Sequence, residues 1–421
     1  MARFLLSSGT GDGHLYPLVP IACELTGRGH QVVWLTGAAF KEKVESTGAI
    51  FHPFPKEIDS SIEGVHVFYP EWNKLTGIAL AKFILKVCLD ISPTLIRTID
   101  EILAGFPADV LVSDTAIFAP YLYSEMGGPP SVMISFTPLG ISSRDTAPYG
   151  LGILPGSSPV SKQKNRLFNF VAEQILFRDV TMHANQVRRK LGLAPLTGSF
   201  FRSVYQIPSL VLQTTTPAFE YPRSDLPGSV HFVGPLLPGV GERFQPPVWW
   251  ADLNGSQPVV LVNQGTVAMD LDDLVNPAIE GLKDEKMLVI TVPVMKDRFD
   301  FLPDNVRAEP FIPFGYLMPY VDVVVTNGGY GGTQMALSHG IPLVVAGDTE
   351  DKMEVAARVE WSGAGINLRK KRPLSTEVRQ AVQKVLSVPA YRESAKRIQS
   401  DFAKYNTPAR IADHLEMLSG K

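Results

Sequence analysis

Cysteine is nearly absent from this sequence, which holds only Cys23 and Cys88 in 421 residues. Two thiols cannot build the disulfide framework of a small secreted domain or a four-thiolate metal site. The eight histidines show neither a His-Glu-x-x-His pattern nor the His-x3-5-His spacing of zinc sites. We therefore expect no metal site of these types.

An excess of charge of one sign and long apolar runs are also lacking. Lys plus Arg number 39 against 42 for Asp plus Glu, which gives a net charge of -3. With no basic surplus and no basic amphipathic face, neither a nucleic acid nor a membrane is an expected partner. The longest apolar stretch, near residues 79–90, contains Lys82 and Lys86 and is far shorter than the roughly 20 residues of a membrane span. The N-terminus shows no secretory cleavage pattern, so we expect a cytoplasmic protein.

Apolar residues are abundant, at 45%, against 19% for charged residues. This composition is typical of a globular protein with a large core and excludes a disordered chain. Because domains usually run to about 100–200 residues, the length predicts two domains. A proline-rich stretch from about residue 215 to 258 lacks strand or helix periodicity, which is typical of an interdomain linker.

Short apolar runs alternate with helical segments on both sides of this stretch. Such runs indicate buried parallel strands at 3–8, 31–36, 109–113, 131–136, 259–262, 288–292, 322–326 and 343–346. Alternating strands and helices are typical of a parallel sheet that helices cover on both faces. We therefore predict an α/β protein with two doubly wound, Rossmann-like domains.

A glycine turn follows the first predicted strand. Residues 9–14 read Gly-Thr-Gly-Asp-Gly-His, and a helical pattern runs from Leu15 to Thr26. The spacing is Gly-x-Gly-x-Gly, whereas dinucleotide-binding turns have Gly-x-Gly-x-x-Gly and an acidic residue after the second strand, which is missing here. These differences argue against NAD or FAD.

The same turn presents His14 at the carboxyl end of a strand, where open parallel sheets bind ligands. A helix N-terminus disfavours a protonated imidazole, so we expect a neutral His14 that can act as a general base. Asp114 comes just after the strand at 109–113, and its carboxylate can then orient the imidazole from the same rim. Structural alternatives stay open: His14 can bond to its own loop, and Asp114 can be the N-cap of a helix.

A second glycine loop, Asn327-Gly328-Gly329-Tyr330-Gly331-Gly332, lies between the strand at 322–326 and a helix that starts near Thr333. Backbone N–H groups of such a loop, next to a helix N-terminus, are typical of a phosphate site. Glycine turns of this kind are common, so the loop alone does not identify a ligand.

Three segments together resemble family 1 (UDP-glycosyltransferase-like) inverting glycosyltransferases. The run from Asp322 to Leu368, with TNGGYGGTQMALSHGIPLVVAGDTEDK inside it, resembles their donor-binding signature. The opening GTGDGHLYPLVPIACELTGRGHQVVWLTG resembles the start of these enzymes, with a Gly-His-x-x-Pro element at Gly13, His14 and Pro17. VVLVNQGTVA at 259–268 resembles the first strand and turn of their donor domain.

The resemblance implies the GT-B fold, in which two Rossmann-like domains face each other across a cleft. It implies an acceptor-binding domain at 1–234, a linker at 235–258, a nucleotide-sugar donor domain at 259–390, and C-terminal helices at 391–421 that pack back on the N-terminal domain. His14 then takes a proton from an acceptor hydroxyl, Asp114 orients His14, and the hydroxyl attacks the anomeric carbon with inversion. A nucleoside diphosphate leaves, and the family requires no metal.

The resemblance also implies a donor site. Phe311, Pro313 and Phe314 hold the nucleoside, Thr266 lies near the phosphates, and Asp351 bonds sugar hydroxyls. The other implied donor contacts are Gly11, Asn327, Gly328, Gly329, Gly331, Gly332, Thr333 and Lys352. The family usually has tryptophan, histidine, glutamate and glutamine where this chain has Phe311, Asn327, Met335 and Lys352. Lys352 either contacts the donor or pairs with a neighbouring glutamate in solvent.

We therefore predict a UDP-glycosyltransferase, a hexosyltransferase that uses UDP-glucose as the expected co-substrate and needs no cofactor. The expected acceptor is a hydroxyl of a lipophilic small molecule, as in natural product glycosylation. The alternatives are a nucleotide-sugar binding protein without transfer activity and a GT-B-fold UDP-sugar epimerase. Four aromatic residues are candidates for an acceptor pocket, with ordinary packing as the alternative: Tyr69, Trp72, Phe136 and Phe168.

Overall fold

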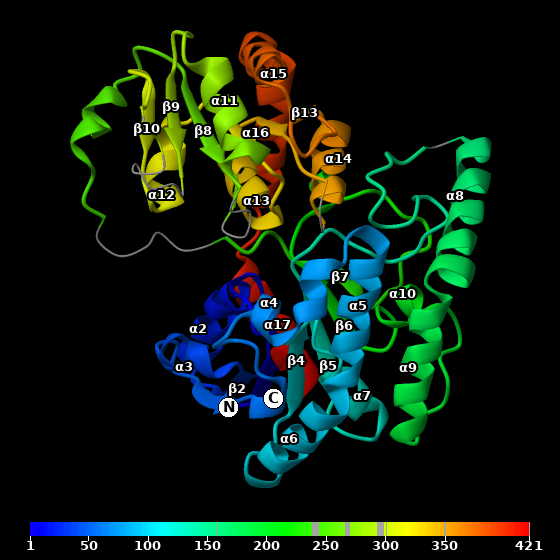
Figure 1. The fold of residues 1–421 in the computed structure, drawn as a ribbon. Coiled ribbons are helices and arrows are strands. Elements are labelled where there is room, and N and C mark those ends of the chain that lie inside the picture. Colours follow the sequence, from blue (N-terminus) through cyan, green and yellow to red (C-terminus); the bar gives the residue numbers. More distant parts are fainter. Residues whose placement is uncertain are drawn as a thin grey trace.

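A computed structural model describes residues 1–156, 158–237, 244–265, 270–292, 299, 301–348 and 351–420. They form two α/β units, one above the other in Figure 1, and each unit contains a parallel sheet. The lower unit in this view comes from the N-terminal half of the chain, and the upper unit comes from the C-terminal half. The prediction of two parallel-sheet α/β domains is confirmed.

The first sheet has seven strands in the order β3-β2-β1-β4-β5-β6-β7. They are β1 (Arg3–Ser7), β2 (Gln31–Thr36), β3 (Ile50–Pro53), β4 (Val110–Asp114), β5 (Ser131–Ser135), β6 (Leu210–Gln213) and β7 (Val230–Phe232). The strand order reverses between β1 and β4, which pair in parallel with Leu5 beside Leu111. Ligands of open α/β sheets bind at such a reversal, outside the carboxyl ends of the strands.

Helices cover both faces of this sheet because side chains alternate along each strand. Leu5 lies in one buried cluster with Ile99 and Leu111, whereas Phe4 and Leu6 lie in a second buried cluster on the other face. The helices of this unit are α1 (Asp12–Leu15), α2 (Val19–Gly27), α3 (Lys41–Glu45), α4 (Val65–Phe68), α5 (Gly77–Asp90), α6 (Ser92–Gly105), α7 (Ala119–Glu125), α8 (Pro159–Val171), α9 (Arg178–Lys190) and α10 (Phe200–Ser203).

The second sheet has six strands in the order β10-β9-β8-β11-β12-β13, and its order reverses between β8 and β11. The strands are β8 (Val259–Asn263), β9 (Leu288–Thr291), β10 (Val306–Ala308), β11 (Val323–Thr326), β12 (Leu343–Val345) and β13 (Gly365–Asn367). The helices are α11 (Val275–Leu282), α12 (Phe314–Leu317), α13 (Tyr330–Ser338), α14 (Lys352–Ser362), α15 (Ser375–Ser387) and α16 (Pro389–Phe402).

The last helix, α17 (Thr407–Ser419), returns to the N-terminal unit, where Figure 1 shows it in red. Ile411 and Leu415 are fully buried in the same cluster as Leu25 of α2. Arg28 also donates to the carboxylates of Asp413 and Glu416, at 2.7 and 3.1 Å. The C-terminal helix is therefore part of the N-terminal core.

The structure differs from two expectations about the chain's local structure. The proline-rich stretch at 215–258 was expected to lack strands, but β7 lies within it and pairs with β6 at the edge of the first sheet. A strand of this length is too short to produce a clear alternation in the sequence. The helix expected at 15–26 is divided into α1, a 3₁₀ turn at Tyr16–Leu18 and α2, with Pro17 in the turn and Pro20 at the start of α2.

Candidate active site

His14 and Asp114 meet at the reversal point of the first sheet. His14 lies in the last turn of α1, just after β1, and Asp114 is the last residue of β4. The imidazole Nδ1 lies 2.8 Å from Asp114 Oδ2, and the Asp114 side chain is fully buried while that of His14 is 37% exposed. Because a carboxylate can only accept here, the proton lies on Nδ1 and the lone pair of Nε2 is free to take another proton.

Every oxygen of the Asp114 carboxylate has a hydrogen bond. Oδ2 also accepts from the Gly9 N–H at 2.8 Å, and Oδ1 accepts from the N–H groups of Ala116 and Ile117 at 2.8 and 3.1 Å. Asp114 therefore closes the turn before α7 and bonds His14 at the same time, but the alternative interpretation, that Asp114 is a helix N-cap, is wrong. The N-cap of α7 itself is Phe118.

The imidazole is also held by packing. A Cβ added to Gly9 would lie 3.1 Å from His14 Cγ, so the glycine leaves room for the ring. The Phe136 ring meets the imidazole edge-on, with the ring centroids 5.7 Å apart. Gly11 caps the start of α1, and its carbonyl accepts from the His14 N–H at 2.9 Å.

The pKa of His14 lies above its ordinary value of 6.5. Burial lowers this pKa, but the charge of Asp114 and the hydrogen bond to it raise the pKa and outweigh burial. The expectation that the helix N-terminus lowers this pKa was therefore wrong, because α1 has only 4 residues and the carboxylate lies in direct contact. This arrangement stabilises the imidazolium that forms when Nε2 takes a proton.

An apolar pocket begins beside Asp114, at Thr115. It has about 610 Å³ of open space, its mouth included. Its other lining residues are Leu85, Phe118, Met133, Thr137, Pro138, Gly140, Tyr149, Phe200, Phe201, Val204 and Tyr205. Burial raises the pKa of Tyr205, so its hydroxyl keeps its proton at neutral pH.

The aromatic residues proposed from the sequence for an acceptor pocket are not among these lining residues. Phe136 instead packs on His14, Tyr69 packs on Phe83, and Trp72 packs on His66. Phe168 lies under the Lys164 ammonium group. For Tyr69, Trp72 and Phe168, the structure therefore favours the packing alternative.

The second glycine loop lies at the reversal point of the other sheet, directly after β11. Gly328 has φ = +90°, a conformation that favours glycine, and Gly329 is the N-cap of α13. Gly331 and Gly332 form the first turn of α13, with open space around them. The first N–H groups of a helix have no partner within the helix, so this turn can donate to an anion.

The side chains around this loop are deeply buried. Asn327 is 8% exposed, and its Nδ2 already donates to the Gln264 carbonyl. Thr333 is fully buried, at 0% exposure, and Met335 lies in the core at 4% exposure. Met335 is therefore a packing residue.

The other implied donor residues lie on separate elements of the C-terminal unit. Phe311 is 71% exposed and is not a core aromatic, whereas Phe314 packs against the core. Pro313 is the N-cap of α12, Asp351 is the N-cap of α14, and Lys352 is the first residue of α14. Thr266 lies outside the described residues.

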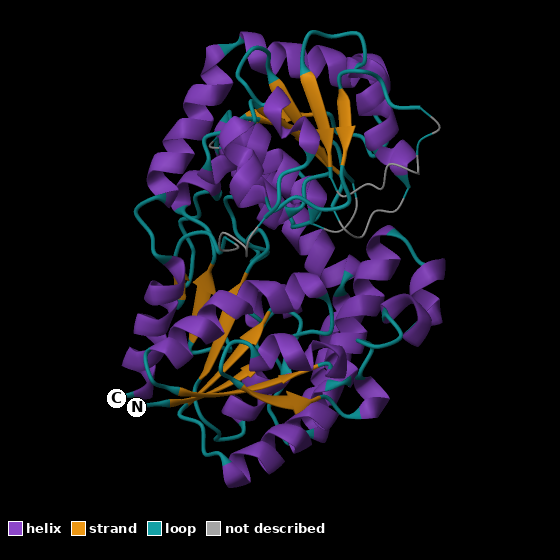
Figure 2. Cartoon of the chain, turned by 90° about the vertical axis from the view of Figure 1, so that its left-hand side faces the viewer, coloured by secondary structure: helices purple, strands orange, loops and turns teal. Residues whose placement is uncertain are grey.

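The carboxyl ends of the two sheets face each other, and Figure 2 shows the strand arrows of the upper sheet pointing toward the N-terminal unit. Gln334 of α13 donates to the carbonyl of Thr214, which follows β6, at 2.9 Å. A buried cluster of charges also joins α14 to the segment after β6; its members are Glu220, Arg223, Glu354 and Arg358. Sequence analysis missed this cluster, although the spacing of Glu354 and Arg358 on one helix was a signal for that pair.

Within the described ranges, no His, Cys, Asp or Glu residues gather in a group of three or more that could hold a metal ion. In the same part of the chain, every helix is too short or too polar to cross a lipid bilayer.

Comparison with known proteins shows what the chain is similar to. Residues 281–418 match the family model of the erythromycin biosynthesis protein CIII-like C-terminal domain. The chain is 41% identical to 4'-demethylrebeccamycin synthase of Lentzea aerocolonigenes, over 100% of this chain and 99% of the relative. It is 34% identical to UDP-glycosyltransferase 2 of Phaeomoniella chlamydospora, over 97% and 93% of the two chains. The solved structure of CalG4, the calicheamicin glycosyltransferase, superimposes with a TM-score of 0.77 at 22% identity, over 100% and 99% of the two chains.

Proposed function

The chain belongs to the family 1, UDP-glycosyltransferase-like enzymes of GT-B fold, and from this membership we propose which sugar transfer it catalyses. It is a glycosyltransferase of natural product glycosylation. The proposed reaction moves a sugar, glucose, from a UDP-sugar to a hydroxyl of a lipophilic small molecule. His14 is the proposed general base and Asp114 the residue that orients it. The pairing of these two side chains beside an apolar pocket is the observation that carries the proposal.

In the proposed mechanism, His14 Nε2 takes the proton of the acceptor hydroxyl as the hydroxyl oxygen attacks the anomeric carbon. The bond between that carbon and the diphosphate oxygen breaks, and UDP leaves with the bonding electrons. Because attack comes from the face opposite the leaving group, the configuration inverts. The carboxylate of Asp114, 2.8 Å from Nδ1, stabilises the positive charge that His14 gains.

The donor is proposed to lie against the loop after β11. The free N–H groups at the start of α13, around Gly331 and Gly332, would bond the diphosphate and stabilise the charge that develops on it. The exposed ring of Phe311 is a platform on which the uracil base would stack. Asp351 and Lys352 at the start of α14 are proposed to contact the sugar.

The acceptor is proposed to bind in the pocket that begins at Thr115. Its lining is mainly aliphatic and aromatic, which suits a lipophilic molecule, and few polar groups break that surface. The pocket is related to the proposed base through Thr115, which lines it and directly follows Asp114 in the chain.

The test is transfer from UDP-glucose to a panel of phenols and sterols, measured with purified wild type and with His14→Ala. We expect His14→Ala to abolish transfer while UDP binding by calorimetry stays within about twofold, since the diphosphate is held by the other unit. His183→Ala is the matched control, because His183 also bonds an aspartate, Asp90, at 2.7 Å, but lies on α9. Unchanged turnover in His14→Ala would remove His14 from the mechanism.

The same experiment separates the alternative functions. UDP binding with no product from any acceptor would favour a nucleotide-sugar binding protein. Conversion of one UDP-sugar into another without an acceptor would favour an epimerase.

A further inference from the structure

One wall of the apolar pocket is a segment without helix or strand, which follows β5. Thr137, Pro138, Gly140 and Tyr149 line the pocket from this segment, which we call the wall loop (residues 137–152). Because no regular structure fixes the loop, side chains from elsewhere must hold its backbone. Several side chains of the N-terminal unit do so, among them Tyr205, Gln213 and Asn169. Two further holding points come from a buried cluster of charged residues.

The first holding point is Leu139, between two of the lining residues. Its N–H donates to Glu220 Oε2 at 3.0 Å, and its carbonyl accepts from Arg223 Nη2 at 2.9 Å. Glu220 and Arg223 are themselves paired at 3.0 Å. They lie after β6, so this point belongs to the N-terminal unit.

The second holding point comes from the opposite unit. Glu354 of α14 accepts from the N–H groups of Gly150 and Gly152 through one oxygen, Oε1, at 2.9 Å each. Gly152 has φ = +57°, and a Cβ there would lie 2.9 Å from the Met353 carbonyl oxygen. The wall loop therefore lies directly on the first turn of α14, next to Tyr149 in the pocket wall.

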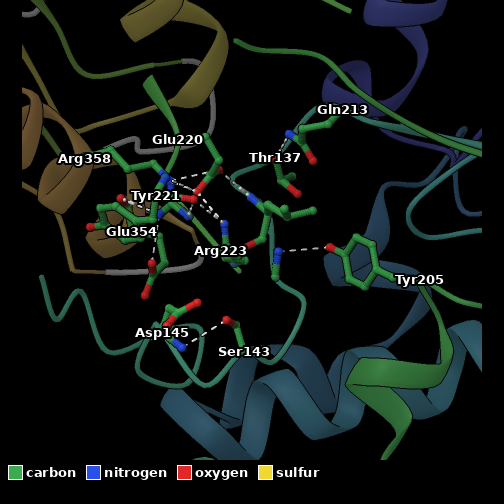
Figure 3. A network of polar contacts seen from close by, with 12 residues as sticks. Thr137, Ser143, Asp145, Tyr205, Gln213, Glu220, Tyr221, Arg223, Glu354 and Arg358 are labelled. Carbon is green, nitrogen blue, oxygen red and sulfur yellow. Dashed lines mark hydrogen bonds and ion pairs between the residues drawn. The ribbon is translucent and has the colours of Figure 1, made fainter. Parts of the chain in front are cut away.

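Arg358 connects the two holding points, as Figure 3 shows. Its Nη2 donates to Glu220 at 2.7 Å and its Nη1 donates to the second oxygen of Glu354 at 2.9 Å. The exposure of Arg358, Glu220 and Glu354 is 0%, 1% and 5%. Charges this deeply buried persist only where partners satisfy them, so the cluster defines one arrangement of α14, the wall loop and the segment after β6.

We propose that Glu354 is a positioning residue that fixes the acceptor pocket from the donor-binding unit. Its helix begins at Asp351 and Lys352, the proposed sugar contacts, so one helix serves the donor sugar and the acceptor wall together. The inference rests on the proposed function. It predicts that loss of Glu354 weakens use of the acceptor while binding of the nucleotide is retained.

The test compares Glu354→Ala, which removes both bonds to the loop, with Glu354→Gln, which keeps an oxygen for them. We expect Glu354→Ala to raise the acceptor KM roughly tenfold or more, because charge-assisted hydrogen bonds to the loop are lost. Glu354→Gln should give a smaller rise, and the dissociation constant for UDP should stay within about twofold in both. Glu360→Ala is the matched control on the same helix, since Glu360 pairs with the exposed Arg369 and should leave the acceptor KM unchanged.

Hydrogen exchange of the amides at 149–153 gives a readout that does not depend on transfer. In both variants these amides should exchange faster than in wild type, more so in Glu354→Ala. If the enzyme transferred no sugar at all, this measurement would still decide whether Glu354 holds the loop. An acceptor KM within twofold of wild type in Glu354→Ala, or unchanged exchange, would overturn the proposal. If Glu354→Ala fails to fold, hydrogen exchange in Glu354→Gln decides: faster exchange of the amides at 149–153 than in wild type supports the proposal, and unchanged exchange overturns it.

Discussion

Replacing Asp114 with asparagine tests the proposed chemistry most directly. The two side chains have nearly the same shape, so the change removes the charge next to His14 and little volume. Wherever its NH₂ group lies, asparagine also loses an acceptor for the N–H of Gly9 or for those of Ala116 and Ile117. We therefore expect lower activity together with a loss of stability of about 1–3 kcal/mol.

The size of the activity loss follows from the contact between the two groups. Asp114 Oδ2 and His14 Nδ1 are 2.8 Å apart, which places the centres of the two charges roughly 4 Å apart. At the effective dielectric of a partly exposed site, such a pair is worth about 4 kcal/mol. Losing that stabilisation of the imidazolium should lower kcat about 10³-fold.

The pH dependence gives a second, independent result. In the wild type, transfer should fall as the pH drops through the pKa of His14, which lies above 6.5. Asparagine removes the negative charge that raises this pKa and leaves burial, which lowers it. The acidic limb of kcat/KM should therefore move to lower pH while the plateau falls. Initial rates between pH 5 and 9, with UDP calorimetry as a folding and binding control, would show this. A variant with wild-type turnover, or with an acidic limb at the wild-type position, would refute the reasoning.

Three further predictions follow from the same structure. His14→Gln should reduce the free energy of unfolding most below pH 6.5, because the raised pKa of His14 in the folded state stabilises the protonated form. The difference in free energy from wild type should shrink as the pH rises through that pKa. Urea titrations in which this difference does not change with pH would contradict the prediction. Gly9→Ala should lower kcat by up to roughly 100-fold, because its Cβ would crowd the imidazole, whereas Gly27→Ala has open space and should change little in the same rate assay. Leu415→Ala should lower the free energy of unfolding, measured in urea, by about 2–5 kcal/mol, since Leu415 is fully buried. Met417→Ala is the exposed control on the same helix, and a similar loss of stability there would show that the loss does not come from the packing of α17 on the N-terminal core.

The candidate site was only partly visible in the sequence. The glycine turn pointed to His14, and the end of an apolar strand pointed to Asp114, because both are local signals. The direction of the His14 pKa was not predictable, since it depends on whether a carboxylate 100 residues away outweighs a short helix. The lining of the apolar pocket was not predictable for a similar reason: the composition shows that aromatics are present, but only packing decides which of them face a cavity.

The sequence by itself determined the class of the fold and the family of the enzyme. Apolar runs of strand length, the helices between them and two glycine turns are patterns within a few residues of chain, and they are enough to predict two parallel sheets. Tertiary structure alone decided how distant residues meet. The Glu220–Arg358 pair is separated by 138 residues, and the Glu354–Gly150 bond by 204. Neither shows in the sequence, because the burial that makes such contacts strong exists only once both sheets have formed and their carboxyl ends face each other.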